Sequence, residues 1–488
     1  MTPNYAELFQ ALLPEAALVI GVLLVLGFDL IAGARHSLER RAAAAASLGI
    51  LAVLAAAGLA LRTGVGEPAF GGVLARDSLT LATRLGVLVL SGLTLGIFGG
   101  TSRLRNPAEF VAVLLLATTG FTLMAAAQQL LLAFLALELA SLSLYVLAGF
   151  DKTRPESAEA ALKYFLFGGL SAAFLLFGFS LLYGLTGSLD FTEIARQLSS
   201  ISLSPLLVVA LVMILVAFGF KAAAAPFHLW APDAYQGAPA PSAALIASAS
   251  KLAGFTLFVR LLWHSAGPVA GSVATMDTRP GWLPVLAVIS LLSLLLGNMG
   301  ALAQTNVRRL LAYSAIAHAG ALLLGVMAAG RVGPAPLFYY AATYGIATVG
   351  AFGVIAVVER AGVCQSLADL AGLRHRSPLL AGCLFIFILS LAGIPPLAGF
   401  FGKFAVFAAA LQLGGLAGIA GWLVVTAILL SAVALYYYLL VLKQAFVARP
   451  AAGASRIPVP AGAALALVIC ALLLVILGLF PSGVLRLF

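Results

Sequence analysis

Five ionisable side chains stand inside stretches that are otherwise long and apolar enough to cross a bilayer. They are one acid and four lysines: Glu138, Lys163, Lys221, Lys251 and Lys403. A charge at mid-membrane depth costs ~2.5–3.5 kcal/mol on insertion scales, so five charges facing lipid would cost on the order of 12–17 kcal/mol. We therefore expect these side chains to face a protein interior or a wetted path. The chemistry open to buried amines and carboxylates there is proton transfer.

The types and order of these residues suggest a route for protons. A buried acid and a buried base are most easily accommodated as a pair, so Glu138 and Lys221 are expected to interact. Pairing favours the charged lysine, whereas burial favours the neutral one, so weakening the pair would release a proton from Lys221. Lys251 is the next expected acceptor. His318 is the expected relay, because imidazole titrates near neutral pH, and Lys403 is the expected exit carrier.

Three candidates have plainer alternatives. Lys163 follows Glu159 by four residues near a helix start, so it could form a surface salt bridge instead. His318 could be a hydrogen-bonded histidine of the core. His228 stands close to Pro226, so it could orient the backbone of a loop rather than carry protons.

The composition indicates a membrane protein. Of 488 residues, 63% are hydrophobic and 9% are charged, with a mean hydropathy of +1.12, whereas a soluble protein carries about 25% charged residues. The net charge of +10 does not indicate nucleic-acid binding, because the basic residues are scattered between apolar runs. The three cysteines lie far apart and the five histidines form no metal-binding motif, so no cofactor is expected in this chain.

A hydropathy window of ~19 residues predicts an all-α polytopic membrane protein with about fourteen transmembrane helices. The expected spans are residues 12–32, 43–61, 79–99, 110–127, 131–150, 161–185, 206–225, 243–263, 283–300, 310–329, 337–358, 379–407, 416–442 and 461–480. Loops after odd-numbered spans carry fifteen Lys and Arg residues, and the other side carries eight. The richer side is expected in the cytoplasm, which places both termini in the periplasm of a bacterial inner membrane.

Spans seven and twelve are expected to be broken. Span seven has Lys221 about one turn before Pro226, and span twelve has Pro395 and Pro396 shortly before Lys403. Spans interrupted by Gly or Pro at corresponding places point to an inverted repeat, although such kinks can also serve packing alone. The expected division is an N-terminal three-helix segment (1–107), two five-helix repeats (108–263 and 282–447, the second inverted) and a C-terminal helix (460–488).

Three segments of the chain resemble the antiporter-like membrane subunits of respiratory complex I. They are LALELASLSLYVLAGF around Glu138, PFHLWAPDAYQGAPAP between Lys221 and Lys251, and QTNVRRLLAYSAIAHAG around His318. The resemblance extends over nearly the whole chain and is most specific in the second of these segments. Of the three paralogous subunit types it is nearest to the N-type. Lys403 stands where the M-type typically carries glutamate, and the sequence ends soon after the fourteenth expected span, so the long lateral helix of the L-type is not expected.

This resemblance implies a proton-translocating subunit of NADH:quinone oxidoreductase, that is, part of a translocase, with no redox group of its own. NADH, FMN, iron–sulfur clusters and quinone would belong to partner subunits, and the chain would lie in the bilayer in a hetero-oligomer with other membrane subunits. Lys163 matches a functional lysine of the family. One alternative is a subunit of an Mrp-like cation/proton antiporter, which Lys403 disfavours because a sodium site requires oxygen ligands. Another is a purely structural subunit, which the buried lysines disfavour.

Overall fold

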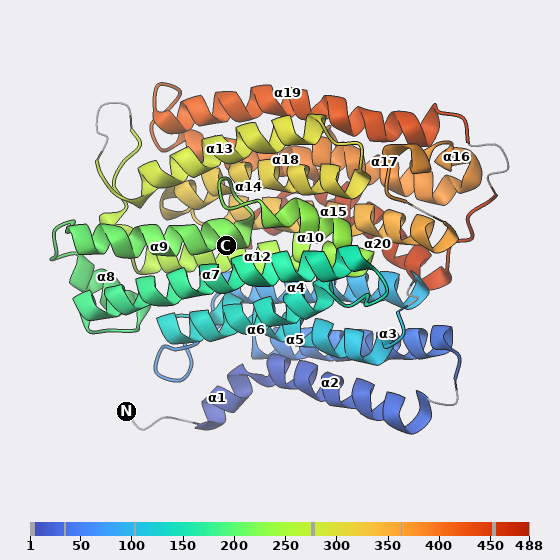
Figure 1. Cartoon of the computed structure of the whole chain (residues 1–488). Coiled ribbons are helices and arrows are strands. Elements are labelled where there is room, and N and C mark those ends of the chain that lie inside the picture. Colours follow the sequence, from blue (N-terminus) through green and yellow to red (C-terminus); the bar gives the residue numbers. More distant parts are fainter. Residues whose placement is uncertain are drawn as a thin grey trace.

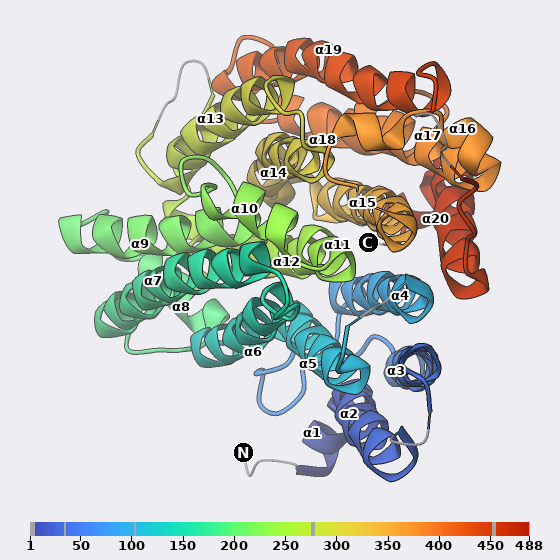
Figure 2. The same ribbon diagram turned by 45° about the vertical axis from the view of Figure 1, so that its right-hand side comes forward.

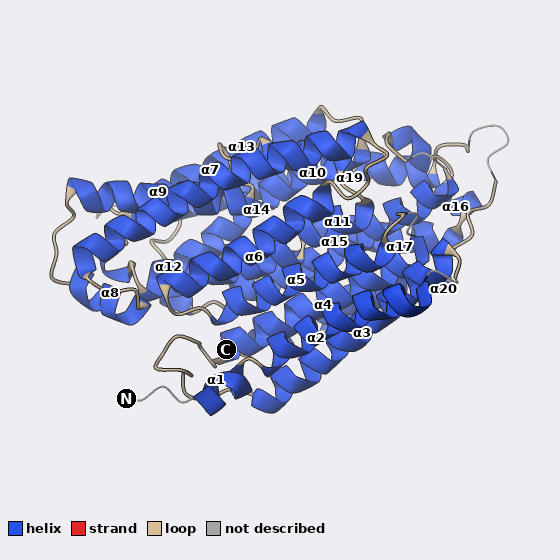
Figure 3. Cartoon of the chain, turned by 60° about the horizontal axis from the view of Figure 1, so that its bottom comes forward, coloured by secondary structure: helices blue, strands red, loops and turns tan. Residues whose placement is uncertain are grey.

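The computed structural model describes residues 5–33, 36–101, 104–274, 279–362, 364–450 and 455–487. Arg35 and Arg103, two of the basic residues counted above, lie outside these ranges. The described residues form a bundle of helices and contain no β-strand (Figure 3). The helices are α1 (Tyr5–Ala11), α2 (Leu13–Ala32), α3 (Leu38–Thr63), α4 (Ser78–Thr101), α5 (Pro107–Ala126), α6 (Leu130–Ala148), α7 (Pro155–Thr186), α8 (Phe191–Leu198), α9 (Pro205–Ala222), α10 (Trp230–Gly237), α11 (Ala240–Ala247), α12 (Ala249–His264), η2 (Gly267–Val269), α13 (Trp282–Leu302), α14 (Val307–Val332), α15 (Ala335–Ala361), η3 (Leu367–Leu370), α16 (Leu373–Arg376), α17 (Pro378–Ala392), α18 (Ala398–Leu411), α19 (Ile419–Phe446), α20 (Ala461–Leu479) and α21 (Ser482–Leu485).

Thirteen candidate spans of the described chain are long and apolar enough to cross a membrane. Two shorter apolar helices, α17 and α18, follow one another and together occupy the expected twelfth span. The prediction of an all-helical polytopic membrane protein is therefore confirmed. Both termini lie in the same half of the bundle as α8 (Figures 1 and 3), as an even number of spans requires.

Both expected helix breaks are present, and the local sequence explains each. Helix α9 ends where Ala223 adopts a left-handed conformation with φ 55° and ψ 41°. Helix α17 ends where Gly393 adopts a left-handed conformation with φ 86° and ψ 43°. Prolines follow both positions and cannot supply the backbone N–H that would continue the helix.

Two features of the fold were not predicted. The eighth span is split at Ser248, with α11 on one side and α12 on the other. A short helix, α8, lies between α7 and α9 at one end of the bundle (Figure 1). The Asp190 side chain caps α8 by accepting hydrogen bonds from the backbone N–H groups of Thr192 and Glu193. A hydropathy window of ~19 residues does not detect an eight-residue amphipathic helix.

The central helices of the bundle are α11, α12, α14 and α15, which are buried over nearly their whole length. Helices α2, α3 and α7 expose much of their surface and lie toward the outside (Figure 2). Helix α4 packs against α3 on one side and against α15 on the other. The proposed proton carriers on α12 and α14 are therefore held by the most buried helices of the protein.

The N-terminal segment is tied to the centre by an ion pair. The guanidinium of Arg260, on α12, is fully buried and donates to the Asp77 carboxylate at 2.5 Å and to the Thr80 hydroxyl at 2.7 Å. Burial raises the pKa of the Asp77 carboxyl, but the hydrogen bond and charge of Arg260 outweigh burial and lower this pKa to about 2. The start of α4 is thus fixed against α12.

Candidate functional site

Lys221 lies in the last turn of α9, directly before the break, and is 6% exposed. Its ammonium donates a hydrogen bond to the Ser141 hydroxyl of α6 at 3.2 Å. Ser141 follows Glu138 by three residues, so both side chains lie on the same face of α6. Among the ion pairs of the described chain none joins Lys221 to Glu138, but the two charges act on each other through space. Lys221 therefore contacts α6 at Ser141, about one turn from Glu138, and the expected coupling acts through space.

Glu138 has an unusual environment for a carboxyl group. Its Oε1 atom is buried and makes no hydrogen bond to the described protein atoms. A buried carboxylate without a hydrogen bond carries a desolvation cost that a proton or a nearby cation relieves. Glu138 is thus placed to respond to the charge state of Lys221.

Lys251 stands at the start of α12, three residues after Ser248, where the eighth span is split. Its ammonium donates to the backbone carbonyl of Ala315 on α14 at 2.6 Å and lies 5.6 Å from the ring centre of Tyr344. The carbonyl and the face of the aromatic ring both stabilise a cation. A narrow void lined by Lys221 and Lys251 has no room for a water molecule in this conformation.

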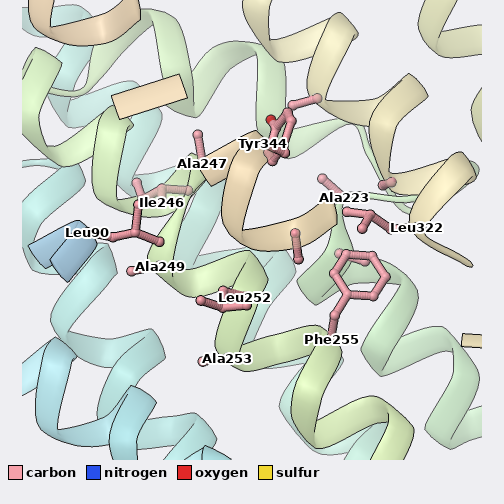
Figure 4. Packing of buried hydrophobic residues seen from close by; sticks show 14 of the residues in the cluster. Leu90, Ala223, Ile246, Ala247, Ala249, Leu252, Ala253, Phe255, Leu322 and Tyr344 are labelled. Atoms are coloured by element: carbon pink, nitrogen blue, oxygen red, sulfur yellow. The ribbon is translucent and has the colours of Figure 1, made fainter. Parts of the chain in front are cut away.

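Tightly packed apolar side chains lie around the start of α12, the helix that carries Lys251. Figure 4 shows Leu252 and Phe255 of α12 together with Ala223, Leu322 and Tyr344 from the neighbouring elements. Each of these side chains is at most 3% exposed. The lysines therefore lie in a dry interior, where a change of protonation state has a large electrostatic effect.

His318 lies three residues after Ala315 on α14, so Lys251 binds α14 about one turn before His318. Its Nδ1 atom is 2.6 Å from the Tyr340 hydroxyl and its Nε2 atom is 3.1 Å from the Tyr438 hydroxyl. Tyr438 also shares a hydrogen bond with Ser314. Both ring nitrogens are therefore engaged. This arrangement meets the hydrogen-bonding needs of a histidine in the core, which is the plainer alternative. It also provides a possible donor or acceptor for a proton on each side of the ring.

Lys403 lies on α18 and its ammonium donates to the carbonyl of Ala392, the last residue of α17, at 3.0 Å. It thus binds the end of the preceding half-helix, where the helix dipole is negative. A cavity of about 20 Å³ is lined by Lys403, His318, Asn298 and Tyr437, among others. That volume accommodates one water molecule, which could connect the histidine with the lysine.

Lys163 lies apart from this line of residues. Its ammonium is 2.6 Å from the carboxylate of Glu159 and 2.6 Å from that of Asp233 on α10, and its side chain is 38% exposed. Asp233 also accepts a hydrogen bond from Arg309 of α14 at 2.5 Å. The alternative salt bridge with Glu159 is therefore present, and Asp233 adds a link from α7 through α10 to α14.

His228 is buried in the link between α9 and α10, and its Nδ1 atom makes no hydrogen bond within the described residues. No hydrogen bond of the described chain connects it to the lysines. The neighbouring Trp230 indole donates to the carbonyl of Phe220 in α9 at 3.1 Å. This part of the break is thus held by Trp230.

Sequence reasoning missed several polar partners. Asp233 is an acid between Lys221 and Lys251 in an otherwise neutral stretch, and this position could have marked it. Tyr340 and Tyr438 stand in apolar helices, where a buried hydroxyl needs a hydrogen-bond partner. Within the described residues no group of three or more His, Cys, Asp or Glu side chains is placed to hold a metal ion.

Comparisons with known proteins bear on what this arrangement does. The family model described as "NADH:quinone oxidoreductase/Mrp antiporter, TM" matches residues 127–431. The chain is 48% identical to a protein of Acidobacterium capsulatum named NADH-quinone oxidoreductase subunit N 2, over 99% of each chain. It is 40% identical to NADH-quinone oxidoreductase subunit N 1 of Roseiflexus castenholzii, over 96% of this chain and 95% of that protein.

Solved structures share the fold. A chain of respiratory complex I from Thermus thermophilus superposes with a TM-score of 0.80 at 35% identity, over 97% of this chain and 98% of that one. A chain of the Mrp complex from Dietzia sp. DQ12-45-1b superposes with a TM-score of 0.79 at 21% identity, over 98% and 96% of the two chains. The second similarity concerns the fold alone.

Proposed function

The chain belongs to the NADH:quinone oxidoreductase/Mrp antiporter family of membrane proteins, and we propose that it is the N-type proton-translocating subunit of an NADH:quinone oxidoreductase. The observation that carries the proposal is the line of titratable groups inside the bundle, buried on α9, α12 and α14 and half-buried on α18. This line lies in a fold similar to a chain of complex I. The chain acts as part of a translocase: quinone is reduced elsewhere in the complex, and this subunit moves protons.

Proton transfer begins at Lys221. When Glu138 is ionised, its negative charge favours the charged ammonium of Lys221. When Glu138 gains a proton or turns away, burial favours the neutral amine and Lys221 releases its proton toward Lys251. The void between the two lysines is dry in this conformation, so this step requires a movement that admits water. In this proposal the resting subunit has a dry void between Lys221 and Lys251, and the conducting subunit has water in it.

The second half of the path runs from Lys251 to Lys403. The Lys251 ammonium is held by the carbonyl of Ala315, one turn before His318, and the imidazole passes a proton through Tyr340 or Tyr438. A single water in the cavity beside Lys403 completes the path. Lys403 then releases the proton.

Lys163 and His228 do not carry protons in this proposal, unlike the titratable groups on α9, α12, α14 and α18. Lys163 affects the path electrostatically through Asp233, at the far end of the break from Lys221. His228 orients the link between α9 and α10, which agrees with its lack of a hydrogen bond to any proposed carrier.

The two proposed five-helix repeats, 108–263 and 282–447, share a local packing feature. A Cβ atom at Gly120 of α5 would lie 2.6 Å from the backbone nitrogen of Ala140 of α6. A Cβ atom at Gly297 of α13 would lie 2.4 Å from that of Ala317 of α14. The first helix pair of each repeat thus approaches through glycine facing alanine. This likeness and the two breaks support the division, with the segments 1–107 and 460–488 outside the repeats.

The chain is placed in the bacterial inner membrane with both termini in the periplasm. The support is the excess of Lys and Arg in loops after odd-numbered spans, fifteen against eight. NADH, FMN, iron–sulfur clusters and quinone are assigned to partner subunits of the hetero-oligomer, and this chain to proton transfer alone. Its energy therefore comes from those partners.

An Mrp-like cation/proton antiporter subunit is the alternative, and one observation opposes it. Lys403 places an ammonium, bound to a backbone carbonyl, at the expected exit position. A fixed sodium site needs several oxygen ligands, which an ammonium repels. Lys403 therefore favours proton transfer over sodium transport.

The test uses the assembled complex in proteoliposomes, with protons moved per electron as the readout. Lys251→Ala should reduce pumping by roughly tenfold or more, which corresponds to about 1.4 kcal/mol in a rate. Lys251→Arg should not restore it, because a guanidinium does not lose its proton in proteins. Lys443→Ala, at an exposed lysine on α19, is the matched control and should pump normally. Normal pumping by an assembled Lys251→Ala complex would overturn the proposal.

A further inference from the structure

A cavity of about 760 Å³ lies at the end of the bundle that carries most of the basic residues. Its walls come from the ends of α4, α5, α6, α11, α14 and α15 and from the loops between them. None of the proposed proton carriers lines it. Because helix ends and loops form the walls, the cavity lies at the boundary between hydrocarbon and water.

The cavity carries an excess of positive charge. Its lining includes five basic and three acidic side chains, and these are Arg105, Lys152, Arg154, Arg308 and Arg360, and Glu109, Asp151 and Glu359. The buried guanidinium of Arg308 is already bound to Glu359 and to the carbonyls of Gln236 and Ala238. Arg105 and Lys152 are exposed, and in the described chain neither forms an ion pair. These two cations are available to an anion.

One wall of the cavity continues into an apolar surface. Val146 of α6 lines the cavity and is 52% exposed. Leu131, Leu135 and Leu142 are similarly exposed, and their spacing places all four side chains on one face of α6. Fifteen residues of helix extend about 22 Å, which exceeds the about 15 Å of hydrocarbon in one leaflet. The stripe is thus long enough for an acyl chain that starts at the cavity.

We propose that this cavity binds the headgroup of an anionic glycerophospholipid, with the acyl chains along the exposed stripe of α6. Arg105 and Lys152 bind the phosphate oxygens, and the remaining volume takes the polar part of the headgroup. Basic pockets between transmembrane helices on the cytoplasmic side are typical sites for such lipids. The lipid joins the loop after α6 to the start of α11, which is part of the cavity wall through Pro239 and Pro241.

The test is lipid binding to the delipidated, assembled complex, followed by native mass spectrometry. Phosphatidylglycerol should bind, whereas phosphatidylcholine with the same acyl chains should bind much more weakly. Arg105→Gln combined with Lys152→Gln should weaken phosphatidylglycerol binding by roughly tenfold to thirtyfold. The matched control is Arg374→Gln in α16 with Arg449→Gln in the loop after α19. Both arginines are exposed, belong to the same basic set and do not line the cavity, so this variant should bind like the unmodified complex.

A second measurement covers the case in which the double variant fails to assemble. A photoreactive phosphatidylglycerol with its reactive group in the acyl chain should label peptides of α6 in the unmodified complex. Inorganic phosphate and glycerol phosphate should compete only weakly, because they lack the acyl chains. Equal binding of both lipids, displacement by inorganic phosphate at matching concentration, or crosslinking of the α6 stripe to a partner subunit instead of lipid would each overturn the proposal.

Discussion

The two broken helices use the same backbone device but place their lysines on opposite sides of it. Lys221 precedes its break, on α9, and is bound by Ser141 from another helix. Lys403 follows its break, on α18, and binds the carbonyl of Ala392 at the end of α17. The first lysine therefore depends on side chains of α6, and the second depends on the backbone of its own broken span.

This difference assigns separate controls to the two proposed proton carriers. The charge of Lys221 responds to Glu138, a group that can itself gain or lose a proton. The charge of Lys403 responds to a helix end, whose partial negative charge stays constant as long as α17 ends where it does. A carrier with a switchable partner suits the controlled step, and a carrier with a fixed partner suits release.

The largest expected effect is on pumping, and it should be equal at the two breaks. Lys221→Ala and Lys403→Ala should each reduce protons pumped per electron by roughly tenfold or more, because a line of carriers fails at any missing member. The measurement is proton uptake by proteoliposomes, with the amount of assembled complex as control. If only one of the two substitutions reduced pumping, the lysines would not belong to a single path.

The next effect should distinguish the two lysines by their dependence on Glu138. In thermal unfolding of the complex, Glu138→Gln and Lys221→Met should be non-additive by about 0.5–3 kcal/mol, as interacting groups are. Glu138→Gln and Lys403→Met should add within about 0.5 kcal/mol, as distant groups do. Equal coupling to both lysines would contradict the separate controls.

Substitutions at the two left-handed residues should have opposite signs. Gly393→Ala should destabilise by about 1–2 kcal/mol, because φ 86° is strained for a residue with a Cβ atom. The new Cβ atom would also lie 3.0 Å from Cδ of Lys403, so pumping should fall as well. Ala223→Gly should be neutral or stabilise by up to about 1 kcal/mol, because Ala223 already has φ 55°. Thermal unfolding of each variant complex measures both, and destabilisation by Ala223→Gly would argue against this account.

The smallest expected effect concerns the hydrogen bond that closes the first break. Trp230→Phe removes the indole donor to the carbonyl of Phe220 but retains most of the packing. This carbonyl also accepts the backbone N–H of Ala223, so the loss should be only about 0.5–1.5 kcal/mol, with pumping nearly unchanged. A large loss of pumping in a stably assembled Trp230→Phe complex would mean that Trp230 controls Lys221 directly.

The sequence alone determined the membrane spans, the two breaks and the lysines that could carry protons. Hydropathy over a window of residues, a proline at a helix end and the cost of a charge in lipid are local properties, so Lys221, Lys251 and Lys403 could be identified without a fold. The split at Ser248 escaped detection because no proline or glycine marks it and its neighbours are apolar.

Only the tertiary structure decided what each of these lysines contacts. The Lys221 ammonium donates to Ser141, three residues after Glu138 on α6, and Asp233 binds Lys163 across 70 residues of sequence. The pairing of such groups depends on how neighbouring helices are rotated and shifted against each other, which is set by packing over the whole bundle. The chain can therefore mark Asp233 as a conspicuous acid, but it does not show which lysine Asp233 binds. The positions of the charged residues within the membrane spans could therefore be predicted from the sequence, whereas the residues that they contact depend on how the helices pack.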